Sequence, residues 1–272
     1  MRFFSYKPAA PLGHLVEGFW DVAYAPSHPR VRILPSGSNE LVINLSQDEI
    51  RIYDSEQPER CQRFPGIVVA GTYAGALDID PMRHASMLGV HFKPGGAFPF
   101  FGEAVGELAN SHVALEALWG RSAGELREKL CSAPTRQKRF QLLEEALTNR
   151  LQRLSKHPSV SLALDIFGST GVGASVGAVA KRVGLSQRHF IQVFTAQVGL
   201  TPKLFSRVLR FQNARDAVDS TGKPNWSQLA LACGYYDQSH MIEDFRAFSG
   251  LSPGEYLGLR NKPLSPDHVP VV

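Results

Sequence analysis

The chain has 272 residues, of which 43% are hydrophobic and 20% are charged, a composition typical of one large or two ordinary folded domains. No apolar run approaches the ~18 residues of a membrane-spanning helix, and residues 1–10 lack the apolar stretch of a secretion signal, so we expect a cytoplasmic protein without a membrane partner. The three cysteines, Cys61, Cys131 and Cys233, are widely spaced, which argues against both a disulfide framework and a zinc cluster.

The formal net charge of +4 is concentrated in one part of the chain. Residues 160–262 contain 11 basic and 7 acidic residues, whereas the remainder contains 18 of each kind. A basic C-terminal third beside a neutral remainder predicts that the two parts have different partners, and that the C-terminal part binds a polyanion.

The first hundred or so residues are predicted to be rich in β-structure. The clearest strand is Glu40–Leu45, which lies between two clusters of turn residues, and Arg51–Tyr53 is its candidate hairpin partner. Further strands are expected at Ile67–Ala70 and Ser86–Lys93, because each run ends at glycine or proline. Short strands separated by turn signals favour a small barrel or sandwich.

The pattern becomes helical from residue 97 onward. Short helices are predicted at residues 97–101, 115–119 and 123–130, followed by a longer one at Arg136–Leu154. The longer helix carries one apolar stripe, formed by Phe140, Leu143, Leu147, Leu151 and Leu154. Two interpretations of this stripe stay open, since it can pack on its own domain or pair with a second subunit.

The run Lys156–Ser159 contains a proline and is predicted to end the helix and link two domains. We therefore expect an N-terminal domain of residues 1–156, a second domain of residues 157–262 and a tail of residues 263–272.

Two segments of the C-terminal third match each other. Val179–Ser186 corresponds to Leu229–Asp237, with Gly184 aligned to Gly234. The offset is 50 residues up to these glycines and 51 residues after them, so the second turn contains one extra residue. Repetition at this length predicts that one supersecondary unit occurs twice.

Each unit is predicted to be a helix, a short glycine turn and a second helix. In the first unit, Gly184 follows the last periodic apolar residue, where a helix favours a left-handed C-cap, and Ser186 is a good N-cap for the next helix. In the second unit, Gly234 and Asp237 have the same two roles. A single pattern of this kind would indicate an ordinary helical hairpin, but two copies in the basic third favour a DNA-binding module.

A longer helix is predicted between the units, from Pro202 to about Ser220. Lys203, Arg207 and Arg210 recur at i, i+4 and i+7 and therefore share one face. This face is either a solvated surface or a row of phosphate contacts that sets the register on DNA without reading sequence.

Residues 158–260 resemble the DNA-binding domain of the AraC/XylS family of bacterial transcription regulators. The most specific stretch is Gly234–Met241, followed by Phe245-Arg246 and Gly250–Pro253. The resemblance implies seven helices, two helix-turn-helix units joined by a long helix, and no catalytic activity. It also implies that the second helix of each unit enters one of two successive major grooves of double-stranded DNA.

The resemblance places the first recognition helix at residues 187–197 and the second at residues 238–248. The positions that it assigns to the DNA bases are Gln187, Arg188, Ile191, Gln192 and Thr195 in the first helix, and Gln238, Ser239, Ile242 and Glu243 in the second. Arginine suits guanine, glutamine suits adenine, and isoleucine suits the thymine methyl group. Phosphate contacts are expected from Lys203, Arg207, Arg210 and Arg246.

Glu243 departs from the family pattern, which often has arginine at this position. With Asp244 it is expected to form an acidic pair on the groove-facing helix. Glutamate can accept a hydrogen bond from cytosine N4, but acidic groups near phosphates weaken binding. We therefore expect the second unit to bind DNA more weakly than the first.

The N-terminal half resembles a cupin-like domain found ahead of such DNA-binding domains. The matching pieces are residues 34–45, 89–96 and 118–120. The resemblance implies a role in sensing or dimerisation but no particular ligand. The expected fold class is α+β with two domains, a β-rich cupin-like barrel or sandwich with trailing helices and then an all-α domain of seven helices.

We expect a sequence-specific DNA-binding transcription regulator that is not an enzyme and has no cofactor, with activation and repression both open. One alternative is a DNA-targeted enzyme, such as a repair protein with this tail, and another is a ligand-independent DNA-binding dimer. The expected partners are double-stranded DNA, a small-molecule effector, RNA polymerase and a second copy of the chain. No metal site is expected, because His84 and His91 are seven residues apart and would face opposite sides of one unbroken strand.

Overall fold

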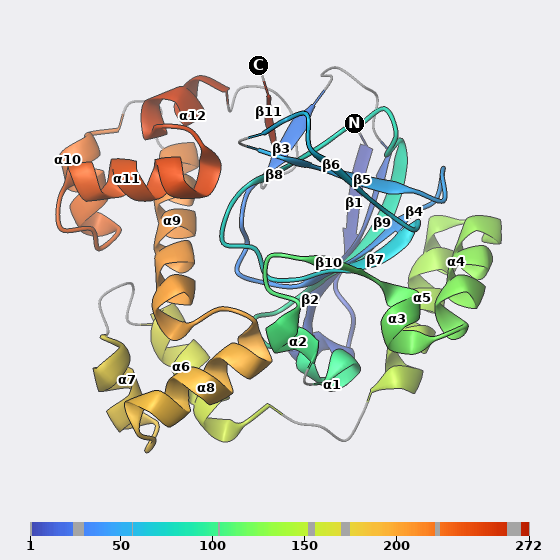
Figure 1. Cartoon of the computed structure of the whole chain (residues 1–272), viewed down its shortest axis with the longest axis horizontal. Coiled ribbons are helices and arrows are strands. Elements are labelled where there is room, and N and C mark those ends of the chain that lie inside the picture. The colour runs from blue at the N-terminus through green and yellow to red at the C-terminus, as the bar shows by residue number, and fades with distance from the viewer. Residues whose placement is uncertain are drawn as a thin grey trace.

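The computed structural model describes residues 2–23, 30–55, 57–102, 104–151, 156–169, 175–220, 224–259 and 268–271. It contains a β-rich N-terminal domain with trailing helices and an all-helical C-terminal domain, which lie side by side (Figure 1). The expected fold class is confirmed. Within the described ranges, no helix has both the length and the apolar content that crossing a membrane requires.

The N-terminal domain is built from two antiparallel sheets. The six-stranded sheet has the order β1 (Arg2–Tyr6), β2 (Val16–Ala23), β9 (Ser86–Phe92), β4 (Glu40–Asn44), β7 (Ile67–Ala70) and β10 (His112–Ala114). The five-stranded sheet has the order β11 (His268–Pro270), β3 (Val31–Ile33), β8 (Leu77–Ile79), β5 (Ile50–Asp54) and β6 (Cys61–Phe64).

The strands expected at Glu40–Leu45, Ile67–Ala70 and Ser86–Lys93 are confirmed as β4, β7 and β9. The expected hairpin between β4 and residues 51–53 is wrong, because β7 and β9 already occupy both edges of β4. The chain leaves β4 through a turn held by Asn44, whose side chain bonds the backbone of residues 46, 47 and 49. This turn delivers β5 to the other sheet, where it pairs with β6 and β8.

Five helices follow β9, and most of their buried apolar residues belong to one core with the six-stranded sheet. Their bounds are α1 (Phe98–Phe101), α2 (Ala104–Glu107), α3 (Leu115–Trp119), α4 (Ser122–Ser132) and α5 (Arg136–Arg150). Leu143 and Leu147 of α5 are fully buried, with Phe140 and Leu151 packed beside them. The apolar stripe therefore packs on its own domain, and Leu154 lies outside the described residues.

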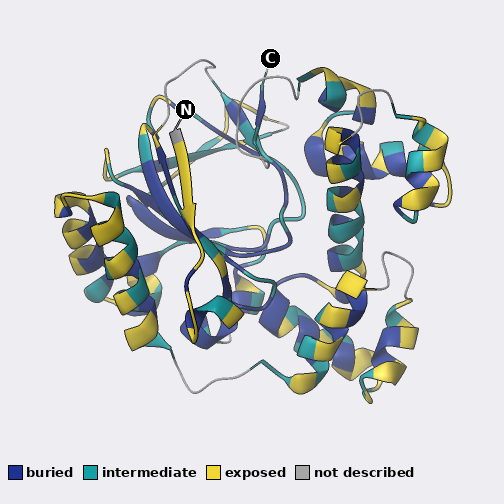
Figure 2. Ribbon diagram, turned by 180° about the vertical axis from the view of Figure 1, so that it is seen from behind, coloured by how far each residue is buried: buried dark blue, intermediate teal, exposed yellow. Residues whose placement is uncertain are grey.

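The described part of the C-terminal domain contains seven helices around a phenylalanine-rich core. They are α6 (Pro158–Ser169), α7 (Val176–Arg182), α8 (Gln187–Val198), α9 (Pro202–Ser220), α10 (Trp226–Ala232), α11 (Gln238–Ser249) and α12 (Pro253–Leu259). In Figure 1, α9 runs between α8 and α11, and the N-terminal domain lies on one side of all three. Buried residues follow α9 and most strands of the sheets, while exposed residues gather on β1 and on outer helices such as α4 and α5 (Figure 2).

The end of the chain returns to the N-terminal domain. We expected residues 263–272 to be a tail, but residues 268–270 form β11, which pairs antiparallel with β3. Val269 of this strand is 4% exposed and belongs to the core of the helical domain. The last strand therefore joins the two domains through both backbone pairing and packing.

Candidate nucleic-acid interface

The two helix-turn-helix units share the same turn geometry. Gly184 has a φ of 76° and Gly234 a φ of 75°, a left-handed conformation that glycine adopts without strain. In each turn the next amide reaches back to the first helix, from Leu185 to the carbonyl of Ala180 at 3.0 Å and from Tyr235 to that of Ala230 at 2.9 Å. The internal repeat in the sequence is therefore a structural repeat.

The second helix of each unit begins at a side-chain cap. The hydroxyl of Ser186 accepts from the amide of His189 at 3.3 Å, and the carboxylate of Asp237 accepts from that of His240 at 2.8 Å. Each cap satisfies an amide that a helix start would leave unpaired. The predicted recognition helices 187–197 and 238–248 thus coincide with α8 and α11.

On α8, three of the five residues predicted to face DNA bases are exposed, namely Gln187, Arg188 and Gln192. Ile191 is half-buried, and Thr195 is half-buried with a hydroxyl oxygen that has no hydrogen-bond partner among the described residues. The exposed polar side chains lie in the first half of α8, which is the end that helix-turn-helix proteins direct toward base edges.

On α11, Ser239, Glu243 and Arg246 are exposed, while Gln238 and Ile242 are half-buried. The Oε1 atom of Gln238 accepts from the hydroxyl of Ser227 at 3.2 Å, which ties α11 to α10.

The acidic pair expected on the groove-facing side of α11 does not form. Asp244 is 1% exposed and points into the domain, so Glu243 is the only member of the pair that faces solvent. The carboxylate of Asp244 accepts two hydrogen bonds from the guanidinium of Arg207, at 2.7 and 3.1 Å. Position i+1 on a helix lies about 100° from position i, which places the two neighbouring carboxylates in different environments.

The three basic residues predicted to share one face of α9 differ in how far they are exposed. Lys203 is exposed, whereas Arg207 and Arg210 are half-buried and both lie against Asp244. Arg210 also lies over the ring of Tyr235, with 5.0 Å between the guanidinium carbon and the ring centroid. These two arginines therefore hold α11 on α9.

The N-terminal domain contacts the last turn of both α8 and α11. The buried hydroxyl of Thr72 donates to the carbonyl of Val198, the last residue of α8, at 2.8 Å. The guanidinium of Arg32 donates to the carbonyl of Ser249, the last residue of α11, at 3.0 Å. A third contact joins α2 to α8 so closely that a Cβ at Gly106 would lie 2.9 Å from the Cα of Ala196.

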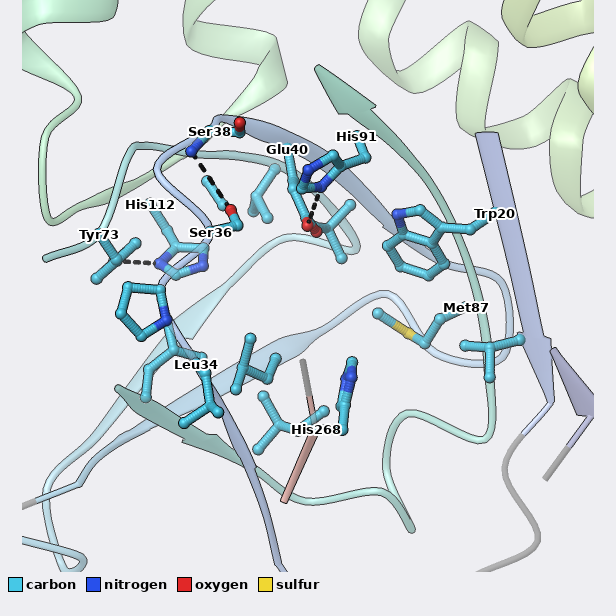
Figure 3. A pocket seen from close by; sticks show the side chains of 18 of the residues that line it. Trp20, Leu34, Ser36, Ser38, Glu40, Tyr73, Met87, His91, His112 and His268 are labelled. Carbon is cyan, nitrogen blue, oxygen red and sulfur yellow. Dashed lines mark hydrogen bonds and ion pairs between the residues drawn. The ribbon is translucent and has the colours of Figure 1, made fainter. Parts of the chain in front are cut away.

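A cavity of about 440 Å³ lies between the two sheets of the N-terminal domain (Figure 3). Most of its lining is apolar, including Trp20, Val42, Ile52 and Met87. Its residues come from strands far apart in the sequence, and no periodic pattern marks them as a group. Sequence reasoning therefore named no pocket residue.

Histidines form part of the cavity wall. His84 lies before β9 and not within it, so the expectation that His84 and His91 face opposite sides of one strand is wrong, and both line the cavity. His84 is 1% exposed and both ring nitrogens are engaged, with the carbonyl of Asp80 at 2.8 Å and the amide of Arg51 at 3.3 Å. No group of three or more His, Cys, Asp or Glu side chains among the described residues is arranged to hold a metal ion.

The cavity wall contains a tyrosine–histidine pair. The hydroxyl of Tyr73 and Nδ1 of His112 are 2.5 Å apart. Burial lowers the pKa of His112 to about 4, so its ring is neutral at pH 7, and burial also raises the pKa of Tyr73 and keeps its phenol protonated. Glu40 and His91 form a second pair nearby at 2.8 Å.

Family profiles match both domains. Residues 4–114 match a domain of unknown function, DUF6597, and residues 179–258 match a helix-turn-helix domain. The second match spans both units, α8 and α11 included, and confirms the AraC-type resemblance of this part of the chain.

Two relatives carry names that describe them as transcriptional regulators. The chain is 33% identical over 82 residues to the probable transcriptional regulator LumQ of Photobacterium leiognathi, which covers 30% of this chain and 33% of LumQ. It is 30% identical over 89 residues to the HTH-type transcriptional regulator Rv1931c of Mycobacterium tuberculosis, which covers 33% of this chain and 34% of that protein. The chain thus spans about a third of the length of each relative.

Among solved structures, the chain is similar to ToxT of Vibrio cholerae O395, with a TM-score of 0.49 and 8% identity over 88% of this chain and 97% of that one. It is also similar to a transcriptional regulator with an AraC-type DNA-binding domain from Chromobacterium violaceum, with a TM-score of 0.36 and 26% identity over 39% of this chain and 96% of that one.

Proposed function

Since residues 179–258 are a helix-turn-helix domain of the AraC type, we propose that the whole protein is a transcription regulator that binds a specific DNA sequence through α8 and α11. The single observation that carries the proposal is the structural repeat, in which two matched units hold their second helices at opposite ends of α9. This arrangement suits two successive major grooves on one face of a duplex.

Direct readout falls to the exposed polar residues of the two helices. Arg188 is suited to guanine and Gln192 to adenine on α8, while Ser239 and Glu243 are the exposed candidates on α11. The proposed set of base-facing residues also includes the exposed Gln187. It is completed by four half-buried residues, Ile191, Thr195, Gln238 and Ile242.

Phosphate anchoring falls first to Lys203 and Arg246, which are exposed. Arg207 retains 37% exposure of its side chain and is placed to add a phosphate contact without leaving Asp244, whereas Arg210 retains 17%. We therefore assign Arg210 mainly to holding α11 in place.

The test of this function is selection of a binding sequence from a random duplex library by the purified full-length protein. We expect an enriched site with two half-sites about one helical turn apart. Binding that is equal on all duplexes, or absent at low salt, would refute sequence-specific regulation. The variant Arg188→Ala should change the preferred base at one position of the first half-site only.

The cavity supports an effector-controlled regulator over a ligand-independent dimer. It lies directly behind the segment that contacts the helical domain, because Leu34 lines the cavity and also belongs to the core formed by α6 to α12. A bound molecule would therefore shift the balance between two arrangements of the DNA-binding domain. DNA affinity that responds to a ligand of the purified protein would distinguish the two functions.

We also propose that the protein is cytoplasmic and contacts RNA polymerase, as the regulator names of LumQ and Rv1931c suggest. We further propose that it pairs with a second copy of the chain. A sedimentation measurement with and without the selected duplex tests this pairing.

A further inference from the structure

The cavity between the two sheets has a definite chemistry. Its volume of about 440 Å³ is roughly three times that of an engineered protein cavity of about 150 Å³ that binds benzene. It lies within the usual size range of small-molecule sites. The Tyr73–His112 and Glu40–His91 pairs lie on one side of it, and His268 lies on the opposite side (Figure 3).

Lys7 is the one lysine or arginine in the described lining of the cavity, and it offers no buried positive charge to an anionic ligand. Lys7 is 81% exposed at the rim and pairs with Glu17 at 3.2 Å, so its charge is solvated and matched. Glu40 is the other carboxylate of the wall, and it already bonds His91. A carboxylate ligand would lose its hydration without gaining a buried positive partner from the described residues, which is strongly unfavourable.

The Tyr73–His112 pair offers a neutral hydrogen-bond donor instead. Among the described residues, the phenol hydroxyl finds its acceptor in Nδ1 of His112, so the lowest-energy arrangement has Tyr73 donating to that nitrogen. A neutral imidazole that accepts at Nδ1 carries its proton at Nε2. His112 lines the cavity, so this second N–H can serve a ligand acceptor.

We propose that the cavity binds an uncharged, largely apolar small molecule whose hydroxyl, carbonyl or ether oxygen accepts a hydrogen bond from His112, with Tyr73 holding the histidine ring. This inference rests on the proposed function in one respect, because it names the class of effector that the regulator would sense. Its ligand-binding half can be tested without DNA.

Binding also has a short route to the DNA-binding helices. Gly71 and Tyr73 line the cavity, and Thr72 between them points outward to the carbonyl of Val198. A ligand that engages the Tyr73–His112 pair therefore acts one residue away from the contact that holds the end of α8. The same alternation occurs at β3, where Ile33 lines the cavity and Arg32 reaches α11.

The experiment uses three probes that share one rigid apolar body and differ only in their polar group: biphenyl-4-methanol, biphenyl-4-carboxylate and biphenyl-4-methylammonium. Their affinities for the full-length protein are measured by titration calorimetry at pH 7. We expect the alcohol to bind at least about tenfold more tightly than either ion, because the ions must be buried without a free partner. Equal or tighter binding of either ion, or no binding of any probe, would overturn the proposed ligand class.

Two variants locate the hydrogen bond, and one serves as a matched control. Tyr73→Phe and His112→Asn should each lower the affinity for the alcohol by about fivefold to twentyfold, while binding of unsubstituted biphenyl stays unchanged. His14→Gln alters an exposed histidine outside the cavity and should behave as wild type. Circular dichroism confirms that each variant is folded, and an alcohol affinity that is unchanged in both folded cavity variants would refute the assignment of this pair.

Failure of the ligand test and failure of the proposed function have different signatures. If no probe binds but the protein still selects a DNA site, the ligand class is wrong and the regulator function stands. If the alcohol binds but no DNA site is selected, the ligand class stands and the regulator function is wrong.

Discussion

Arg32 of the N-terminal domain donates a hydrogen bond to the carbonyl oxygen of Ser249, the last residue of α11, at 3.0 Å. The same guanidinium pairs with Asp78, which is 1% exposed, at 2.8 Å. Gly250 follows with a φ of 73°, and a Cβ at that position would lie 2.5 Å from the guanidinium. The left-handed glycine thus ends α11 and also leaves room for the arginine.

Helix α8 has a matching contact, from Thr72 to Val198. Together the two contacts hold the C-terminal ends of α8 and α11, while the exposed residues proposed to read DNA lie nearer the opposite ends. The N-terminal domain is therefore placed to set the relative position of the two helices without covering the residues that would read bases.

Removing the hydroxyl of Thr72 should loosen the first of these contacts. In Thr72→Val the side chain keeps its shape, but the buried carbonyl of Val198 loses its donor, which costs about 1–3 kcal/mol of unfolding free energy. Hydrogen exchange should rise at residues 198–200. The control Ser55→Ala removes a hydroxyl that bonds Ala76 within the N-terminal domain, so exchange at residues 198–200 that rises equally in both variants would contradict the assignment.

Substitutions at Asp244 and Glu243 should affect different properties, the free energy of unfolding and the DNA sequence preference respectively. Asp244→Ala leaves Arg207 and Arg210 without their buried partner and should lower the unfolding free energy by about 3 kcal/mol. Glu243→Ala alters an exposed side chain and should change stability by less than about 0.5 kcal/mol, while it alters base preference in the second half-site. Denaturant unfolding and site selection measure the two effects, and a large stability loss in Glu243→Ala would refute this division.

The sequence predicted the helical domain well because its signals are local. Capping residues and turn glycines such as Ser186 and Gly184 act on neighbouring backbone, and the repeat shows the same devices twice. The strand at residues 268–270 gave no such signal, since it is defined by pairing with β3, more than 230 residues away along the chain.

The sequence also did not predict which charged residues are buried. The i, i+4, i+7 spacing placed Lys203, Arg207 and Arg210 on one face of α9 but did not reveal that Asp244 of another helix lies against two of them. The cavity likewise depends on how two sheets meet. Contacts between residues far apart in the sequence therefore decide which residues of a regular spacing stay exposed and can bind a partner.

Arg188 and Lys203 should affect DNA binding in different ways. Arg188→Ala should cost about 1–3 kcal/mol at one base position and relax specificity there. Lys203→Ala should weaken binding to all DNA sequences by the same factor. It should also reduce by about one the slope of the logarithm of affinity against the logarithm of salt concentration. Affinities for the selected duplex and its single-base variants over a range of salt concentrations distinguish them, and a uniform loss in Arg188→Ala would contradict base reading.

Acid should destabilise the protein through His112. Burial lowers the pKa of this histidine from its ordinary 6.5 to about 4, so between these two pH values the unfolded chain binds a proton that the folded chain does not. The stabilising effect of keeping the ring neutral is complete above pH 6.5 and is lost as the pH falls toward 4. Between pH 7 and pH 5 the wild-type unfolding free energy should therefore fall by about 2 kcal/mol more than that of His112→Asn. Parallel curves for wild type and His112→Asn would show that the ring is accessible to protons in the folded state.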